Sequence, residues 1–199
     1  MKACWFDAFG AAHDVLQQGD WPTPEPGPGE VLVQLHATGV NPSDVKKRAG
    51  GFPDLLAAGP VIPHSDGAGV ITAVGEGVSP SRVDERVFVY QAQYGRQLGT
   101  AAETIALDST RAPVLPDAAS FEVGACIGIP IMTAHRCVFA DGPVAGQLIL
   151  VTGGAGRVGH YAIQWAHRAG ARVIATASSE EDATACREAG AEAVVNHRV

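Results

Sequence analysis

Lysine is scarce in this sequence, and positive charge is scarce with it. The 199 residues include only three lysines, Lys2, Lys46 and Lys47, and the formal net charge is −7. A surface with this balance attracts no polyanion over long range. We therefore expect no nucleic-acid partner, and we interpret the run Lys46-Lys47-Arg48 as a solvated face.

Metal-type cysteine spacing and long apolar segments are also missing. The four cysteines are scattered at Cys4, Cys126, Cys137 and Cys186, which is typical of buried or free thiols in a reducing compartment. No apolar run approaches the roughly 20 residues that a membrane-spanning helix needs. The first ten residues lack the apolar core of a signal peptide. The sequence predicts a cytoplasmic protein with no membrane partner.

Glycine, by contrast, is abundant at 24 residues, and in the first part of the chain it punctuates short strands. These strands are predicted over Glu30–Ala37, Gly69–Val74, Arg86–Tyr90 and Ala101–Leu107. Gly/Pro turns separate them. We predict a compact, barrel-like β-domain over residues 1–119.

The pattern changes after residue 119. Ser120 can cap a helix, and a further helix is expected over Ile131–Phe139. Strands then alternate with helices, in the order Gln147–Thr152, Val158–Ala169, Ala171–Ala177, Glu180–Ala189 and Glu192–Asn196. This alternation is typical of a parallel, doubly wound sheet. The fold class is therefore α/β, with a nucleotide-binding type of domain over residues 120–199.

A glycine-rich loop joins the first of these strands to its helix. The pattern G-x-G-x-x-G falls on Gly154, Gly156 and Gly159. An apolar strand precedes it and an amphipathic helix follows, which is the context that dinucleotide binding requires. Free N–H groups at the helix start can then bind the pyrophosphate. The cofactor-binding residues predicted in this loop are Gly153, Gly154, Ala155, Gly156, Arg157, Val158 and Gly159.

The tip of the second strand indicates which nucleotide binds. An NAD site usually places a carboxylate there to hold the ribose 2′-hydroxyl. This strand ends instead in Ser178 and Ser179, which favours the 2′-phosphate of NADP(H). His197 and Arg198, after the third strand, are the candidate basic partners of that phosphate.

Other users of glycine loops fit less well. A P-loop needs Gly-Lys-Ser/Thr, whereas this loop continues Gly159-His160-Tyr161. No tyrosine has a lysine four residues later, as a short-chain dehydrogenase would require. Flavoproteins and methyltransferases remain possible from the loop alone, although both usually carry an acidic strand tip.

The chain as a whole resembles the zinc-free quinone oxidoreductase (zeta-crystallin-like) branch of the medium-chain dehydrogenase/reductases. The motifs that carry this resemblance, besides the glycine loop, are Pro24–Val31, Thr38–Asp44, Asp66–Val70, Val74–Val78 and Gly128–Ala134. The resemblance implies a GroES-like substrate domain followed by a Rossmann domain. It also implies NADPH-dependent reduction of a quinone, enone or 2-alkenal, and a homodimer.

Zinc is not expected. Zinc-dependent relatives carry cysteine and histidine ligands where this chain has Asn41 and Ser65, and neither can supply a thiolate or an imidazole. The resemblance implies that Asn41 and Thr133 lie near the nicotinamide. Phe52 stands where relatives often have tyrosine, so it can pack on an aromatic acceptor but cannot donate a proton. Hydride transfer then depends on orientation and desolvation.

Two departures from the family pattern bear on these expectations. The lysine that the family uses for the 2′-phosphate corresponds to Asp182, a reversal of charge. Family members also continue past Val199, so we expect a truncated chain whose half-sheet has an exposed edge. Two alternative functions therefore stay open: reduction of an enoyl thioester, and a non-catalytic, nucleotide-binding or crystallin-like structural role.

Overall fold

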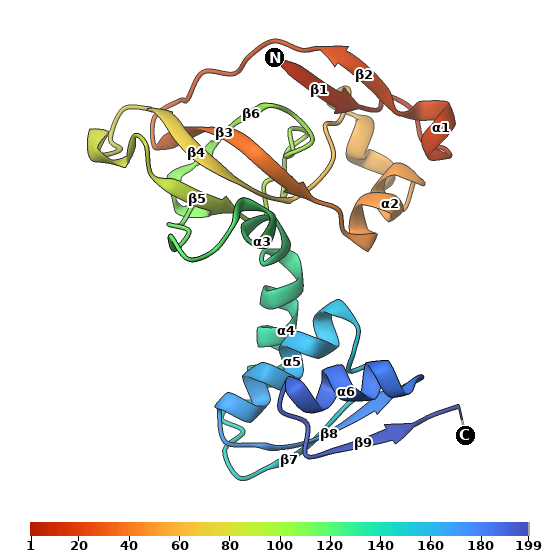
Figure 1. The fold of residues 1–199 in the computed structure, drawn as a ribbon. Helices are drawn as coiled ribbons and strands as arrows, with labels where there is room; N and C mark the ends of the chain where they lie inside the picture. Colours follow the sequence, from red (N-terminus) through yellow and green to blue (C-terminus); the bar gives the residue numbers. More distant parts are fainter. Residues whose placement is uncertain (199) are drawn as a thin grey trace. The chain divides into compact units, whose positions relative to one another are not determined.

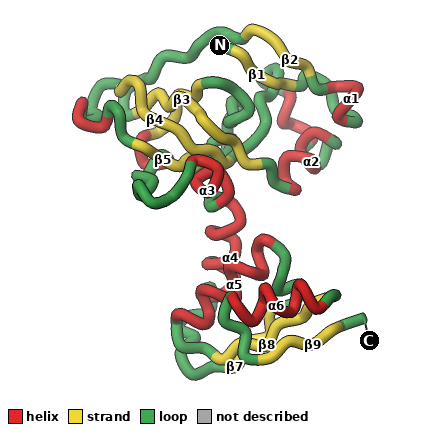
Figure 2. The backbone as a smooth tube through the Cα atoms, viewed as in Figure 1, coloured by secondary structure: helices red, strands yellow, loops and turns green. Residues whose placement is uncertain are grey.

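The computed structural model describes residues 1–198, which divide into two compact units between Ile129 and Pro130. Strands dominate the first unit, and helices alternate with strands in the second (Figures 1 and 2). The sequence placed a domain boundary between residues 119 and 120, and this boundary stays a prediction. No described helix is both long and apolar enough to cross a membrane.

The first unit is built around a four-stranded antiparallel sheet in the order β5-β4-β3-β6. Its strands are β3 (Glu30–Gly39), β4 (Asp66–Val74), β5 (Arg86–Val89) and β6 (Thr104–Asp108). They coincide with the predicted strands to within a few residues at each end. The strand β4 begins three residues earlier than predicted, at Asp66, and so includes residues of the candidate site.

Alternation along these strands explains the core. Val31 and Val33 on β3, Val87 and Val89 on β5, and Ile105 on β6 are buried. Successive residues of a strand point to opposite faces, so every second residue enters the core. Two β-bulges interrupt the β3–β4 pairing, between Leu32 and Val33 and between Leu35 and Ala37, and bulges of this kind bend a sheet.

Several short elements surround this sheet and were not predicted. The strands β1 (Lys2–Trp5) and β2 (Gln17–Asp20) form a separate hairpin-like pair that includes α1 (Ala12–Val15) in its connection. An isolated bridge between Ala3 and Ala102 ties β1 to the rest of the unit. The helix α2 (Pro42–Arg48) follows β3 directly.

The helix α3 (Phe121–Cys126) begins as predicted. Ser120 is its N-cap, and the hydroxyl of Ser120 accepts a hydrogen bond from the N–H of Val123 (3.3 Å). The helix packs against β3 and β4, and Ala125 is buried there with Ala68 and Leu115. This packing explains why α3 belongs to the first compact unit, although the sequence placed it with the second domain.

The second unit has a parallel three-stranded sheet in the order β7-β8-β9. Its elements are α4 (Ile129–Phe139), β7 (Leu148–Val151), α5 (Arg157–Arg168), β8 (Arg172–Ala177), α6 (Glu180–Glu188) and β9 (Ala193–Asn196). The helices α5 and α6 lie side by side on one face of the sheet (Figure 1). This arrangement confirms the predicted α/β alternation.

The core of the second unit lies between the sheet and these two helices. Ile163 of α5, Val173 and Ala175 of β8, and Cys186 of α6 are fully buried in it. On β7, by contrast, Leu148 and Leu150 are 60% and 62% exposed. The strand β7 is an edge of the described sheet, and the face that carries these two leucines is open to solvent.

Candidate functional site

The glycine loop between β7 and α5 has the strand–loop–helix geometry that the sequence predicted. Gly153 has a φ of +63°, a left-handed conformation that a residue with a side chain adopts only with strain. Two hydrogen bonds to Thr176 of β8 hold the loop: the N–H of Gly153 donates to Thr176 Oγ1 and the N–H of Gly154 donates to the Thr176 carbonyl, both at 2.9 Å.

Close packing explains two further glycines. A Cβ atom on Gly154 would lie 2.7 Å from Cys186 Sγ and 2.9 Å from Ala175 Cβ. A Cβ atom on Gly159 would overlap the carbonyl oxygen of Gly153. These positions therefore require glycine for the helix to approach the strand and loop, as in dinucleotide-binding folds.

The start of α5 is free to bind an anion. Gly156 is its N-cap, and no side chain caps the helix. The first N–H groups of a helix have no partner within it, and the partial positive charge of the helix N-terminus favours a phosphate there. Of the predicted loop residues, Ala155 is half-buried, whereas Arg157 and Val158 are exposed in the first turn.

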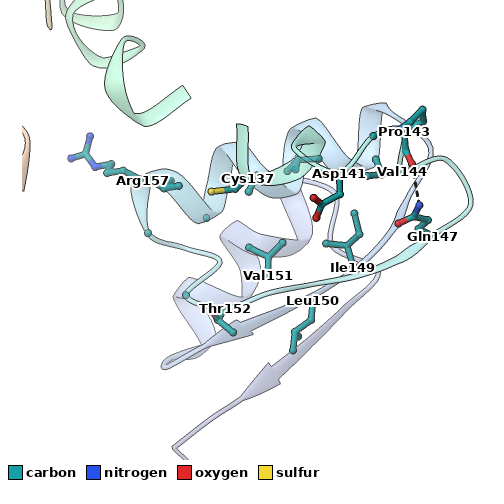
Figure 3. A pocket seen from close by; sticks show the side chains of 17 residues that line it. Cys137, Asp141, Pro143, Val144, Gln147, Ile149, Leu150, Val151, Thr152 and Arg157 are labelled. Carbon is teal, nitrogen blue, oxygen red and sulfur yellow. Dashed lines mark hydrogen bonds between the residues drawn. The ribbon is translucent and has the colours of Figure 1, made fainter. Parts of the chain in front are cut away.

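A pocket of about 630 Å³ borders this loop. Residues of the loop, of β7 and of the segment after α4 line it, and these include Thr152, Gly153, Gly156, Ile149 and Asp141. Figure 3 shows the side chains of Ile149 and Val151 on one side of β7 and those of Leu150 and Thr152 on the other. The side chain of Arg157 extends away from β7, from the first turn of α5 (Figure 3). The loop thus faces a space large enough for part of a ligand.

The tip of β8 differs from the sequence interpretation. Ser178 Oγ donates a hydrogen bond to Asp182 Oδ2 (2.9 Å), and Ser179 Oγ accepts one from the N–H of Asp182 (3.1 Å) as the N-cap of α6. The end of the strand itself carries no carboxylate, but the first turn of α6 brings that of Asp182 to Ser178.

The basic residues after β9 reach the same region. Ala177 of β8 pairs with Asn196 of β9, and His197 and Arg198 follow, both exposed. Hydrogen bonds from Ser178 and Ser179 lower the pKa of Asp182, and the positive charge of Arg198 lowers it further. Of the predicted 2′-phosphate residues, the two serines thus hydrogen-bond Asp182, and Arg198 acts on the same carboxylate through its charge. His197 donates its backbone N–H to the Ala177 carbonyl (3.2 Å).

In the first unit, Asn41 belongs to a buried polar cluster. Its side-chain amide donates to Asp66 Oδ2 (2.8 Å), and the N–H of Ile129 donates to the same oxygen (2.9 Å). Its backbone N–H donates to Asp44 Oδ2 (2.7 Å) as part of the capping box of α2. Thr133, in the second unit, is exposed on α4.

Asp66 is the most perturbed titratable group of this cluster. Burial raises its pKa from 3.8 to about 6, against the lowering effect of the hydrogen bonds from Ile129 and Asn41. Its Oδ1 is buried without a hydrogen-bond partner among the described residues. No local sequence pattern indicates this, since the burial of Asp66 depends on the segment around Gly128, where a Cβ atom would collide with the carboxylate.

A second pocket, of about 510 Å³, lies entirely within the first unit. Phe52 lines it and is 51% exposed, and Gln91 and Tyr94 line it too. Lys47 lies in the same wall, half-buried, and donates to Gln93 Oε1 (2.8 Å). The interpretation of Lys47 as part of a solvated face was therefore wrong, although Lys46 is exposed as expected.

The residues at the zinc-ligand positions of zinc-dependent relatives do not fit zinc. The amide of Asn41 is engaged with Asp66, and Ser65 offers a hydroxyl, a poor ligand beside the thiolate and imidazole that zinc prefers. His64, next to Ser65, adopts a φ of +76° and shares a hydrogen bond with Thr38 Oγ1 (3.0 Å). Over residues 1–198, no three His, Cys, Asp or Glu side chains gather as a metal site would need. The absence of zinc stays a prediction.

Both units match known protein families. Residues 27–138 match the alcohol dehydrogenase GroES-like domain family, and residues 158–199 match the family described as zinc-binding dehydrogenase. The chain is 37% identical over 199 residues to quinone oxidoreductase from Rattus norvegicus, covering 100% of this chain and 59% of that protein.

Solved structures of quinone oxidoreductases are similar too. That from Pseudomonas syringae is 32% identical with a TM-score of 0.85, and covers 98% of this chain and 58% of its own. That from Escherichia coli, complexed with NADPH, is 27% identical with a TM-score of 0.82, and covers 100% of this chain and 59% of its own. The chain thus spans about three fifths of the length of these relatives. With its match to the alcohol dehydrogenase GroES-like domain family over residues 27–138 and its Rossmann-type glycine loop, the chain belongs to the medium-chain dehydrogenase/reductase superfamily, and along its whole length it is similar to quinone oxidoreductases.

Proposed function

We propose that this chain carries the acceptor-binding domain and the phosphate-binding half of the nucleotide domain of an NADPH-dependent reductase for quinones or other conjugated carbonyls. The observation that carries this proposal is the glycine loop, in which Gly153, Gly154 and Gly159 have the conformations and contacts that dinucleotide binding needs. The proteins that resemble the chain are quinone oxidoreductases, and one of them was solved in complex with NADPH. This similarity supports NADPH as the nucleotide and a quinone as the acceptor.

The loop would hold the pyrophosphate of NADP(H). Backbone N–H groups of Arg157, Val158 and Gly159 at the start of α5 are placed to donate to its oxygens. Ser178, Ser179, His197 and Arg198 would surround the 2′-phosphate. Asp182 opposes that role, so we expect only a moderate preference for NADPH over NADH.

The bound nucleotide supplies a hydride to the conjugated acceptor. The protein's part is to orient the acceptor and exclude water. We assign Asn41 and Thr133 to the nicotinamide end of the site, and Phe52 to packing against an aromatic acceptor. The carbonyl is activated without a zinc ion in this proposal, because Asn41 and Ser65 supply no thiolate or imidazole.

The wider setting follows from the family and the charge. We propose that the whole protein acts as a homodimer in the cytoplasm. We expect no nucleic-acid partner at a net charge of −7.

The test is a fluorescence titration of the 199-residue chain with NADPH and with NADH, followed by NADPH oxidation with a quinone and a 2-alkenal. We expect NADPH to bind more tightly than NADH. Gly159→Ala should abolish binding because its Cβ would overlap the Gly153 carbonyl. The matched control is Gly27→Ala, where the nearest atom is the flexible Glu30 Oε2 at 3.4 Å.

Two outcomes would go against the proposal. A chain that binds neither nucleotide has no functional glycine loop. A full-length protein that binds NADPH but oxidises it with no acceptor would fit the non-catalytic, nucleotide-binding alternative instead.

A further inference from the structure

The pocket of the first unit has an unusual charge for this protein. The chain as a whole carries a net charge of −7, yet Lys47 and Arg96 both line this one pocket. The acidic residue in its lining is Asp54, which is exposed to solvent, where its charge is screened. Two basic side chains, one of them half-buried Lys47, thus line the pocket against one exposed carboxylate.

Lys47 is held in this wall without a direct ion pair to a described carboxylate. Burial lowers its pKa, and the negative charge of Asp44 acts in the opposite direction. In the described part of the chain, no carboxylate lies within ion-pair distance of the Lys47 ammonium. Its hydrogen-bond partner is the neutral Gln93 Oε1 at 2.8 Å. An ammonium has three N–H donors, so two remain for a ligand.

Two neighbouring polar groups also lack partners. Ser43 Oγ and Gln93 Nε2 are buried with no hydrogen-bond partner among residues 1–198, and both residues line the pocket. Ser43 and Lys47 are four residues apart on α2, so their side chains share a helix face. Each of these groups can donate, and a ligand rich in acceptor atoms would satisfy them together with Lys47.

The other walls of the pocket favour a flat ligand. Phe52 is 51% exposed and Tyr94 is 70% exposed, and exposed aromatic rings at a pocket are suited to stacking on a planar group. The segment from Gln91 to Tyr94 is fixed by Arg111, whose guanidinium donates to the carbonyls of both residues (3.1 and 3.3 Å). The pocket therefore combines planar apolar contacts with a cluster of donors.

We propose that this pocket binds a planar aromatic or quinonoid acceptor that carries a carboxylate, and that Lys47 is the residue that pairs with the carboxylate. The inference rests on the proposed reductase function, since it names the class of acceptor for that reaction. Ser43 and Gln93 add hydrogen bonds to the same carboxylate, and Phe52 and Tyr94 contact the ring.

A purely structural role of Lys47 gives a different expectation. Cations in the last turn of a helix are stabilising wherever they point, and Lys46, exposed in the same turn of α2, has this effect too. If Lys47 were purely structural, its replacement would therefore change the stability of the fold, but the pocket would bind charged and neutral ligands with the same relative affinity as before.

The test uses two probes of the same shape, 2-naphthoate and its neutral amide, 2-naphthamide. Their binding to the 199-residue chain is measured by isothermal titration calorimetry without nucleotide. We expect the carboxylate to bind about tenfold more tightly than the amide, as one charge-assisted hydrogen bond provides. K47Q should remove this preference, whereas K47R and the control K46Q should retain it.

The wild-type chain alone can overturn the proposal, if it binds the amide as tightly as the carboxylate or binds neither probe. A K47Q chain that still prefers the carboxylate would overturn the assignment of Lys47. Because no NADPH is present, these outcomes are independent of whether the chain reduces any acceptor. Failure of the proposed reductase function would show only in the oxidation assay.

Discussion

Replacement of Asp66 with asparagine is expected to stabilise the first unit at neutral pH. The Asp66 carboxyl is buried, and burial raises its pKa from 3.8 to about 6. The folded state therefore favours the protonated form. Stability from this group is fully present below the unfolded pKa and is lost as the pH rises through the folded pKa.

The magnitude follows from the two pKa values. Each tenfold change in a dissociation constant corresponds to about 1.4 kcal/mol, so ionised Asp66 costs about 3 kcal/mol of unfolding free energy above pH 7. An asparagine at this position carries no charge, and its oxygen can still accept the hydrogen bonds from Asn41 and the Ile129 N–H. The variant should therefore gain most of this free energy at pH 8 and almost none at pH 3.

The measurement is urea denaturation of D66N and of the parent at a series of pH values from 3 to 8. Trp5 and Trp21 lie together in the first unit, so a Trp165→Phe background makes tryptophan emission report that unit. His64, whose pKa burial lowers, and Asp44, whose charge raises the pKa of Asp66, are present in both the parent and the variant. The difference between the two proteins thus isolates Asp66.

A difference in unfolding free energy that does not change with pH would refute this reasoning, as would a D66N protein less stable than its parent at pH 8. D54N is the control, since Asp54 is exposed and should show no such gain.

Three further predictions concern the second unit. Asp182→Lys should raise the ratio of NADPH to NADH affinity at least several-fold, because it frees Ser178 and removes a negative charge near the 2′-phosphate. Both affinities are measured by fluorescence titration. The control is Glu181→Lys, in the same turn of α6 but exposed. Ser179→Ala removes the N-cap of α6 and should lower the unfolding free energy by about 1 kcal/mol, measured by thermal denaturation. Ile163→Ala opens a cavity in the core and should cost about 2–5 kcal/mol in the same assay; a loss below 1 kcal/mol would contradict the burial of this side chain.

Sequence patterns predicted the regular elements well because a buried face gives a regular pattern. The alternation of β3 and the switch to the α/β order of β7, α5 and β8 were found to within a few residues. The strands β1 and β2 were missed because Gln17–Asp20 is polar and has no alternation. Their pairing with each other, and the bridge from Ala3 to Ala102, hold them in place instead.

The candidate site was predictable where local backbone geometry determines it and not where separate segments meet. The glycine loop is a local feature, so its residues could be read from the motif. The raised pKa of Asp66 requires burial against the segment around Gly128, and the position of Lys47 in the pocket wall requires contact with Gln93. The four-residue spacing of Ser43 and Lys47 on one helix was the signal that could have separated Lys47 from its exposed neighbour.

The preference for NADPH or NADH depends on a place where separate segments come together, the end of β8 and the first turn of α6. Two serine hydroxyls at the end of β8 favoured a 2′-phosphate, but the Ser178 hydroxyl donates a hydrogen bond to the Asp182 carboxylate. Arg198 supplies the opposing charge and lowers the pKa of the same carboxylate. A 2′-phosphate entering this region would thus meet one exposed cation, Arg198, and one half-buried anion, Asp182, and solvent weakens the exposed charge most. Discrimination against NADH must then come mainly from hydrogen bonds to the phosphate oxygens, and these become stronger when Ser178 is released from Asp182.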